Sequence, residues 1–142
     1  MVQNPPAGYP RISPYLYYED GAAAIDWLTQ AFGFRERMRM PGDDGRIMHA
    51  ELELDGGVVM LAAPQRERFK NPKELDANTS SVYVYVDDVD GHFQRARQAG
   101  AEILQEPETQ PYGDRHYGAR DPAGHEWWFG QHVEDVSPDE LG

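Results

Sequence analysis

The sequence predicts an α+β fold in which two βαβββ modules form a curved mixed sheet around a central cleft. A strand pattern that ends in acidic residues and leads into an amphipathic helix occurs twice, at residues 12–33 and 80–100. Three strand-like runs separated by turn signals follow each helix pattern. Repetition of one strand–helix–strand unit at a fixed offset is typical of a duplicated fold.

The first copy begins with ISPYLYYED at residues 12–20, a run rich in tyrosine and aliphatic residues. Asp20 suits a helix N-cap, and Gly33 suits the residue that ends a helix. Between them, apolar residues recur at spacings of three and four, which places one apolar stripe on a helix. The stripe comprises Ala22, Ile25, Leu28, Ala31 and Phe32.

The second copy begins with SSVYVYVDD at residues 80–88 and continues with a helix pattern through Val89, Phe93 and Ala96. Asp88 lies 68 residues after Asp20, and Gly100 lies 67 residues after Gly33. The two offsets differ by one residue, so we predict a duplication with one deletion near the end of the second helix.

Three strands are predicted after each helix. Turn signals GDDG and DGG separate those of the first copy, and DPAG precedes the last strand of the second. The predicted strands are 34–40, 46–54, 58–63, 101–105, 115–120 and 125–131.

These elements predict five segments along the chain. Residues 1–9 form a flexible N-terminus, residues 10–63 the first module, and residues 80–132 the second. Residues 64–79 are polar, carry a proline and form the linker between modules. Residues 133–142 form an acidic C-terminal tail in which SPDEL is compatible with a short helix.

Charge and composition exclude several classes of function. The chain has 25 acidic and 13 basic residues, and this excess of negative charge disfavours nucleic acid and anionic membranes as partners. It has no cysteine, which excludes disulfides, thiolate catalysis and zinc–sulfur sites. The longest apolar run is residues 58–63, and the N-terminus has no pattern of a secretory signal. We therefore expect a cytoplasmic protein.

Side chains alternate between the two faces of a strand, so sequence parity predicts which face each one occupies. The valines of residues 82–86 are predicted to face the helix, and the tyrosines between them the opposite side. In residues 46–54, Met48 is predicted on the helix side and Ile47 on the opposite side. His92 is predicted to be solvated, whereas His125 is predicted to be structural.

The faces turned away from the helices are predicted to line the cleft. Aromatic rings with a few polar groups suit a planar organic ligand. The alternative is that the tyrosines cover a solvated sheet or an interface. The predicted ligand-binding residues are Tyr15, Tyr17, His49, Glu51, Leu61, Tyr83, Tyr85, Arg115, His116 and Trp128.

Three stretches carry a resemblance to a known family: YYEDGAAAIDWLTQAFGF, VYVYVDDVDGHFQRARQAGAEI and PYGDRHYGARDPAGHEWWF. Over residues 10–133 the chain resembles the vicinal-oxygen-chelate superfamily, which includes glyoxalase I, bleomycin-resistance proteins and extradiol dioxygenases. It is most similar to the bacterial glyoxalase and bleomycin-resistance-like group. The resemblance implies a homodimer.

The metal enzymes of that superfamily place ligands on the first and last strand of each module. Matching the motifs puts these four positions at Ser13, Leu61, Ser81 and Trp128. Leucine and tryptophan do not bind divalent metals, and serine is a poor ligand. We therefore predict no metal, no cofactor and no catalytic residue, and favour a protein that is not an enzyme.

The leading functional hypothesis is a metal-free binding protein that sequesters an aromatic or polycyclic natural product, as in antibiotic resistance. The first alternative is a metal-dependent lyase, isomerase or dioxygenase with a site relocated to His49, Glu51 and His116. The second alternative is an interaction module that binds no small ligand.

Overall fold

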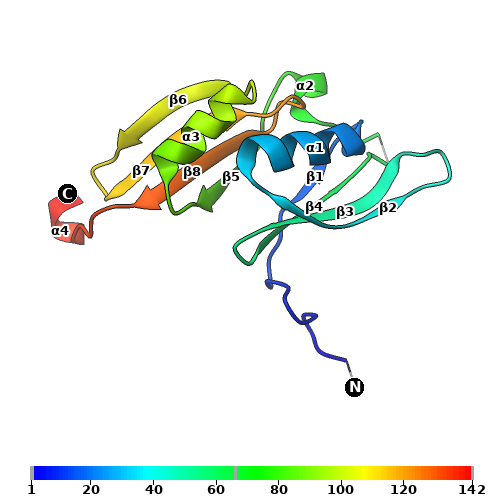
Figure 1. Cartoon of the computed structure of the whole chain (residues 1–142), viewed down its shortest axis with the longest axis horizontal. Helices are drawn as coiled ribbons and strands as arrows, with labels where there is room; N and C mark the ends of the chain where they lie inside the picture. Colours follow the sequence, from blue (N-terminus) through cyan, green and yellow to red (C-terminus); the bar gives the residue numbers. More distant parts are fainter. Residues whose placement is uncertain (1, 66, 142) are drawn as a thin grey trace.

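Each half of the chain folds into a strand, a helix and three further strands in the computed structural model, which describes residues 2–65 and 67–141 (Figure 1). The α+β fold of two βαβββ modules is confirmed. Met1, Arg66 and Gly142, which belong to the predicted termini and linker, lie outside the described residues.

The first module comprises β1 (Tyr15–Tyr17), α1 (Gly21–Phe32), β2 (Arg35–Pro41), β3 (Ile47–Leu54) and β4 (Gly57–Ala62). Its sheet has the strand order β1-β4-β3-β2. β1 pairs with β4 in parallel, and the other neighbours are antiparallel.

The second module repeats this arrangement with β5 (Ser81–Tyr85), α3 (Val89–Gln98), β6 (Glu102–Thr109), β7 (Asp114–Arg120) and β8 (Glu126–His132). Its sheet has the order β5-β8-β7-β6, again with one parallel pair. Two short helices lie outside the modules: α2 (Pro72–Leu75) in the connecting segment and α4 (Pro138–Leu141) near the C-terminus.

The predicted helix boundaries are confirmed by the caps. The Asp20 carboxylate accepts a hydrogen bond from the Ala23 amide at 3.0 Å, and Asp88 accepts one from Gly91 at 3.1 Å. Both satisfy amides that have no partner within the helix. Gly33 ends α1 with a φ of +81°, a conformation that glycine adopts without steric cost.

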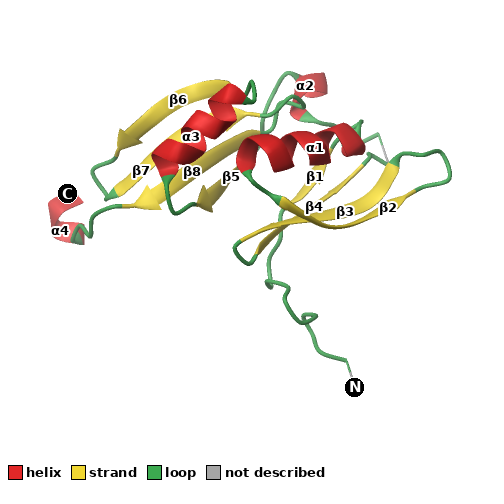
Figure 2. Ribbon diagram, viewed as in Figure 1, coloured by secondary structure: helices red, strands yellow, loops and turns green. Residues whose placement is uncertain are grey.

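One hydrophobic core joins the two modules. α1 and α3 pack against each other, with one sheet on either side of the pair (Figure 2). Phe32 of α1 lies 5.5 Å from Trp127 and 4.6 Å from Phe129 of β8 between ring centroids. Val82 and Val84 pack against this core, as predicted. Core side chains thus fill the space between each sheet and the helices. Only the opposite face of each sheet is available to bind a ligand.

Parity predicted the wrong face at the start of β3. Ile47 belongs to the buried core, whereas Met48 is half exposed. The pairing of β2 with β3 shifts register between Met40 and Pro41. Such an irregularity moves the side chains beyond it to the other face of the sheet, which puts Ile47 on the helix side.

His92, predicted to be solvated, is instead largely buried between the modules. Its Nε2 lies 2.7 Å from the Phe32 carbonyl oxygen, and its Nδ1 lies 2.5 Å from the Tyr117 hydroxyl. His125 has the predicted structural role, since its Nε2 lies 3.0 Å from the Tyr17 carbonyl oxygen. Within the described residues, no helix is long and apolar enough to cross a membrane.

Candidate functional site: two aromatic faces

The face of the second sheet turned away from α3 carries two aromatic side chains that pack closely against glycines. A Cβ atom added to Gly118 would come within 2.7 Å of the Trp128 ring, and one added to Gly130 within 2.1 Å of the Tyr83 hydroxyl. The two glycines therefore let both rings lie against the strands. His116 contacts the edge of this surface, with its ring centroid 5.2 Å from that of Trp128.

Asp114 organises the polar end of this face. Its carboxylate is 5% exposed and accepts hydrogen bonds from the hydroxyls of Tyr83 and Tyr85, each at 2.9 Å. His132 Nδ1 lies 2.8 Å from the other carboxylate oxygen. Burial raises the pKa of Asp114, but the hydrogen bonds from His132 and the two tyrosines outweigh burial and lower it overall.

Asp114 and His132 were missed by sequence reasoning. Asp114 lies two residues before His116, so strand parity puts it on the same face, and this signal was available. Burial raises the pKa of Tyr83, and the neighbouring carboxylate raises it further. Both phenols are therefore held as neutral hydrogen-bond donors.

The first sheet carries a second cluster, built around Glu51. His49 Nε2 lies 2.8 Å from Glu51 Oε2, and the Tyr15 hydroxyl lies 2.9 Å from His49 Nδ1. An ionised carboxylate only accepts hydrogen bonds, so the Nε2 atom of His49 carries a proton and donates to Glu51. The Tyr9 hydroxyl donates to Glu51 Oε1 at 2.5 Å. Tyr17 lies beside this cluster, stacked on Phe69 at 4.5 Å.

Glu51 is 6% exposed, so its charge depends on these partners. Burial raises the pKa of Glu51, whereas the hydrogen bonds from Tyr9 and His49 lower it, with a net lowering. The residue is an ionised acceptor held in place by two donors.

Two predicted site residues lie elsewhere. Leu61 is fully buried in the core on the helix side of β4. Arg115 also points to the helix side, where its guanidinium pairs with Asp90 of α3 at 3.0 Å. Arg115 adjoins His116 in β7, so the two side chains take opposite faces.

The error at Leu61 arises from unequal hairpin turns. Two residues lie between the paired Leu54 and Gly57, whereas three lie between the bonded Asp121 and His125. Equivalent residues of the two modules are therefore again 68 positions apart in the last strands, β4 and β8. Met60, which pairs with Tyr15, corresponds to Trp128, which pairs with Tyr83.

With this correction, the four positions where the metal enzymes of the superfamily have ligands are occupied by Ser13, Met60, Ser81 and Trp128. These side chains do not suit a divalent metal, and the Trp128 ring packs against Gly118. Among residues 2–65 and 67–141, no three histidine, aspartate or glutamate side chains are grouped as metal ligands would be.

The structure brings the remaining predicted residues together in two separate clusters. Tyr15, Tyr17, His49 and Glu51 lie on the first sheet. Tyr83, Tyr85, His116 and Trp128 lie on the second. Within the part of the chain that is described, no hydrogen bond or aromatic contact connects one cluster with the other.

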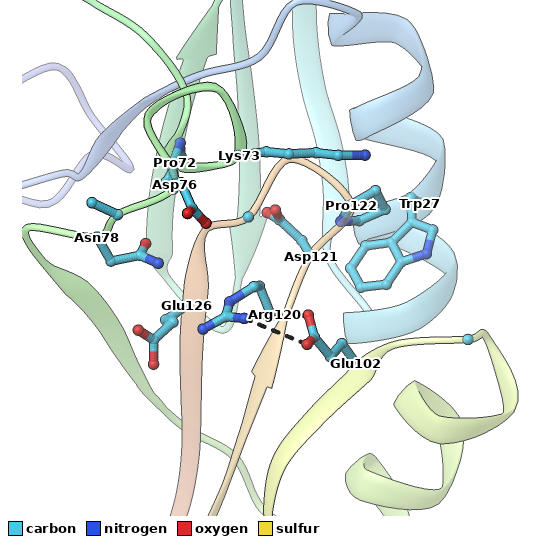
Figure 3. Close-up of a pocket in the computed structure, with 13 residues that line it drawn as sticks. Trp27, Pro72, Lys73, Asp76, Asn78, Glu102, Arg120, Asp121, Pro122 and Glu126 are labelled. Carbon is cyan, nitrogen blue, oxygen red and sulfur yellow. Dashed lines mark hydrogen bonds and ion pairs between the residues drawn. The ribbon is translucent and has the colours of Figure 1, made fainter.

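A cavity of about 630 Å³ lies away from both clusters, around the turn between β7 and β8 (Figure 3). The indole of Trp27 borders it, and the Arg120 guanidinium lies there 3.4 Å from Glu102. Its Asp121 carboxylate is fully engaged by Tyr18 and Trp127 on one oxygen and by two backbone amides on the other. None of the predicted site residues lines this cavity.

Comparison with known proteins identifies relatives over nearly the whole chain. Residues 10–129 match the model of the Glyoxalase/Bleomycin resistance protein/Dioxygenase superfamily. Mb0911c, an uncharacterized protein of Mycobacterium bovis, is 41% identical over 93% of this chain and 90% of its own length. Rv0887c, an uncharacterized protein of Mycobacterium tuberculosis, is 41% identical over 93% of this chain and 80% of its own.

Solved structures share the fold. TioX from Micromonospora sp. ML1 is 38% identical, with a TM-score of 0.70 over 86% of this chain and 98% of its own. A superfamily member from Sphaerobacter thermophilus has a TM-score of 0.69 at 20% identity, over 84% of this chain and 94% of its own. The second likeness concerns the fold alone.

Proposed function

Because the chain belongs to the Glyoxalase/Bleomycin resistance protein/Dioxygenase superfamily, we propose that it binds a planar aromatic small molecule and sequesters it without chemical conversion. The observation that carries this proposal is the aromatic floor of the second sheet, where the Trp128 ring packs against Gly118 and the hydroxyl end of Tyr83 packs against Gly130. A flat ring is best held by other rings at its face and by a few fixed polar groups at its edge.

The polar groups around this floor support binding rather than proton transfer. Asp114 accepts hydrogen bonds from Tyr83, Tyr85 and His132, so it fixes the positions of two phenol oxygens at the edge of the floor. Each phenol gives its one proton to Asp114, so its oxygen is free to accept a hydrogen bond from a hydroxyl or N–H group of a ligand.

We further propose that the cleft is completed by a second copy of the chain. No hydrogen bond or aromatic contact joins the two aromatic clusters within the described residues, and both clusters carry exposed rings. Tyr15, Tyr83 and Tyr85 are 41%, 42% and 62% exposed. Pairing the first sheet of one chain with the second sheet of another would enclose a ligand between rings. Light scattering of the purified protein would then give twice the mass of one chain.

Quenching of tryptophan fluorescence by a panel of aromatic natural products tests the binding function. Trp128→Ala is expected to weaken binding by about 5- to 150-fold, since loss of a stacking partner costs on the order of 1–3 kcal/mol. Trp27→Phe is the matched control, because Trp27 lies on α1 away from the aromatic floor. Absence of quenching by every compound, or equal affinity of Trp128→Ala and the native protein, would refute the proposal.

A metal-dependent reaction at the first sheet is the alternative function, favoured only by the hydrogen-bonded pair of His49 and Glu51. Metal analysis of protein purified without chelator distinguishes it from binding alone. A stoichiometric metal that is lost in His49→Ala would support the alternative and contradict sequestration without chemistry.

A further inference from the structure

Tyr9 occupies the cluster on the first sheet although it belongs to none of the strands. Its hydroxyl donates to Glu51 Oε1 at 2.5 Å. The guanidinium carbon of Arg37 lies 4.2 Å from the centre of the Tyr9 ring, a distance typical of a cation–π contact. One aromatic ring is therefore held at its face by a cation and at its hydroxyl by a buried carboxylate.

A tight turn and one further hydrogen bond hold this ring in place. The Tyr9 amide donates to the Pro6 carbonyl at 3.0 Å, and Gly8 within the turn has a φ of +81°. Arg37 Nη1 donates to the Gly8 carbonyl at 3.0 Å. The residues before the turn extend away from the sheets (Figure 1), so the turn is the point where the N-terminal segment is attached.

The groups around Tyr9 define the chemistry of the group they accept. Glu51 is ionised and is already bonded to His49 through its other oxygen, so Oε1 can take one more hydrogen-bond donor. The Arg37 guanidinium attracts the face of an aromatic ring placed next to that donor. A ring with a hydroxyl at its edge, which is a phenol, satisfies both requirements.

We propose that the first sheet contains a phenol-binding subsite and that Tyr9 is its built-in occupant, which an aryl-hydroxyl ligand displaces. This inference rests on the proposed function of binding a planar aromatic molecule, and it specifies the chemical class of that molecule. Displacement of Tyr9 opposes ligand binding, because only the fraction of molecules with Tyr9 released can accept a ligand.

Two consequences follow from the carboxylate acceptor. An aryl methyl ether has no proton to donate, so it cannot replace the Tyr9 hydroxyl on Glu51. An ionised phenolate also has no proton and is repelled by the charge of Glu51, so binding falls when the ligand ionises.

The test is the affinity of the full-length protein for 7-hydroxycoumarin and for 7-methoxycoumarin, measured by calorimetry at a pH where the phenol is protonated. Tyr9→Ala is expected to strengthen binding of 7-hydroxycoumarin about tenfold or more, because it frees a charge-assisted acceptor. Tyr9→Phe, which keeps the ring over Arg37, is expected to have a smaller effect in the same direction. Neither variant should strengthen binding of the methyl ether to the same extent.

Two further variants complete the design. Tyr112→Ala is the comparison variant: Tyr112 is an exposed tyrosine beside His116 of the second sheet, so any effect of this substitution should be the same for both coumarins. Glu51→Gln combined with Tyr9→Ala is expected to remove the gain, because an amide is a weaker acceptor than a carboxylate.

The proposal is overturned if both coumarins gain equally, if Tyr9→Ala weakens binding, or if the gain survives Glu51→Gln. If one of these results is obtained but other aromatic compounds still quench the tryptophan fluorescence, the phenol subsite is refuted and the proposed binding function is not. If no aromatic compound binds any variant, the proposed function itself fails.

Discussion

At the scale of single residues, the aromatic floor depends on two glycines, which have no side chain to obstruct the rings. Gly118 and Gly130 occupy strand positions where any Cβ would overlap the rings of Trp128 and Tyr83. Glycine in a strand interior lowers strand stability, so its presence twice under aromatic rings indicates a steric requirement.

Gly118→Ala is expected to push the Trp128 ring off the strand. Overpacking of this kind costs about 1–3 kcal/mol, and the displaced indole should change its fluorescence and lose affinity for aromatic ligands. Urea unfolding and fluorescence measure the two effects. Gly57→Ala is a suitable control, because its nearest neighbour is a backbone oxygen at 3.3 Å and no aromatic ring. Equal effects of the two substitutions would contradict the steric role of Gly118.

His92 is expected to make stability depend on pH. Burial lowers the pKa of His92, only partly opposed by its hydrogen bond to Phe32. The unfolded chain therefore binds the proton more readily, and the stability due to neutral His92 is lost as pH falls below the ordinary value of 6.5. The free energy of unfolding of the native protein should decrease more steeply from about pH 7.5 to about pH 5.5 than that of His92→Gln.

His132 provides a control of opposite sign. Hydrogen bonds to Asp114 and Asp135 raise the pKa of His132. The stability that charged His132 contributes to the folded protein is therefore present below the ordinary histidine pKa and is lost as pH rises. His132→Gln should change the pH slope in the direction opposite to His92→Gln, and a change of the same sign would show that the assignment is wrong.

At the scale of elements, the end of α1 is held by side chains of α3. Arg95 donates from Nε to the Gln30 carbonyl at 2.8 Å and from Nη2 to the Thr29 carbonyl at 3.0 Å. Carbonyls in the last turn of a helix have no partner within it, and a cation there also offsets the helix dipole. The two helices therefore depend on each other for capping as well as for packing.

Arg95→Ala is expected to destabilise the protein by about 1–2 kcal/mol, since it leaves the Gln30 carbonyl without a donor and removes the second donor of the Thr29 carbonyl, which also accepts from the Gly33 amide. Arg97→Ala on the same helix is the matched control, because Arg97 is exposed and its side chain makes no hydrogen bond with any of the described residues. Chemical denaturation measures both. Equal loss in the two variants would mean that only the charge near the end of α3 matters.

At the scale of the whole molecule, a buried carboxylate joins the modules. Asp121 of the second module accepts from the Tyr18 hydroxyl of the first at 2.6 Å and from Trp127 Nε1 at 3.0 Å. Asp121 is 4% exposed and Tyr18 is 3% exposed. A buried carboxylate with four donors is favourable only while all of them remain in place.

Asp121→Ala is expected to cost roughly 3 kcal/mol or more, because it leaves several buried donors unpaired. Tyr18→Phe removes a single donor and should cost about 1 kcal/mol. Thermal unfolding of the two variants gives the comparison. If Asp121→Ala were no worse than Tyr18→Phe, the carboxylate would not be the link between modules.

The sequence alone determined the duplicated modules, the helix caps at Asp20 and Asp88, and the aromatic faces of β1 and β5. These follow from local rules, because capping and strand alternation act over a few residues. Alternation failed where pairing was irregular, as at Ile47 and Met48. Leu61 was misplaced because the second hairpin turn is one residue longer.

Only the tertiary structure decided which of these residues meet. The partners of His92, the burial of Asp114 and the position of Tyr9 on Glu51 join residues between 18 and 60 positions apart. No local pattern encodes such contacts, since they depend on how the two sheets and their helices pack together. The separation of the predicted cleft into two aromatic faces has the same origin.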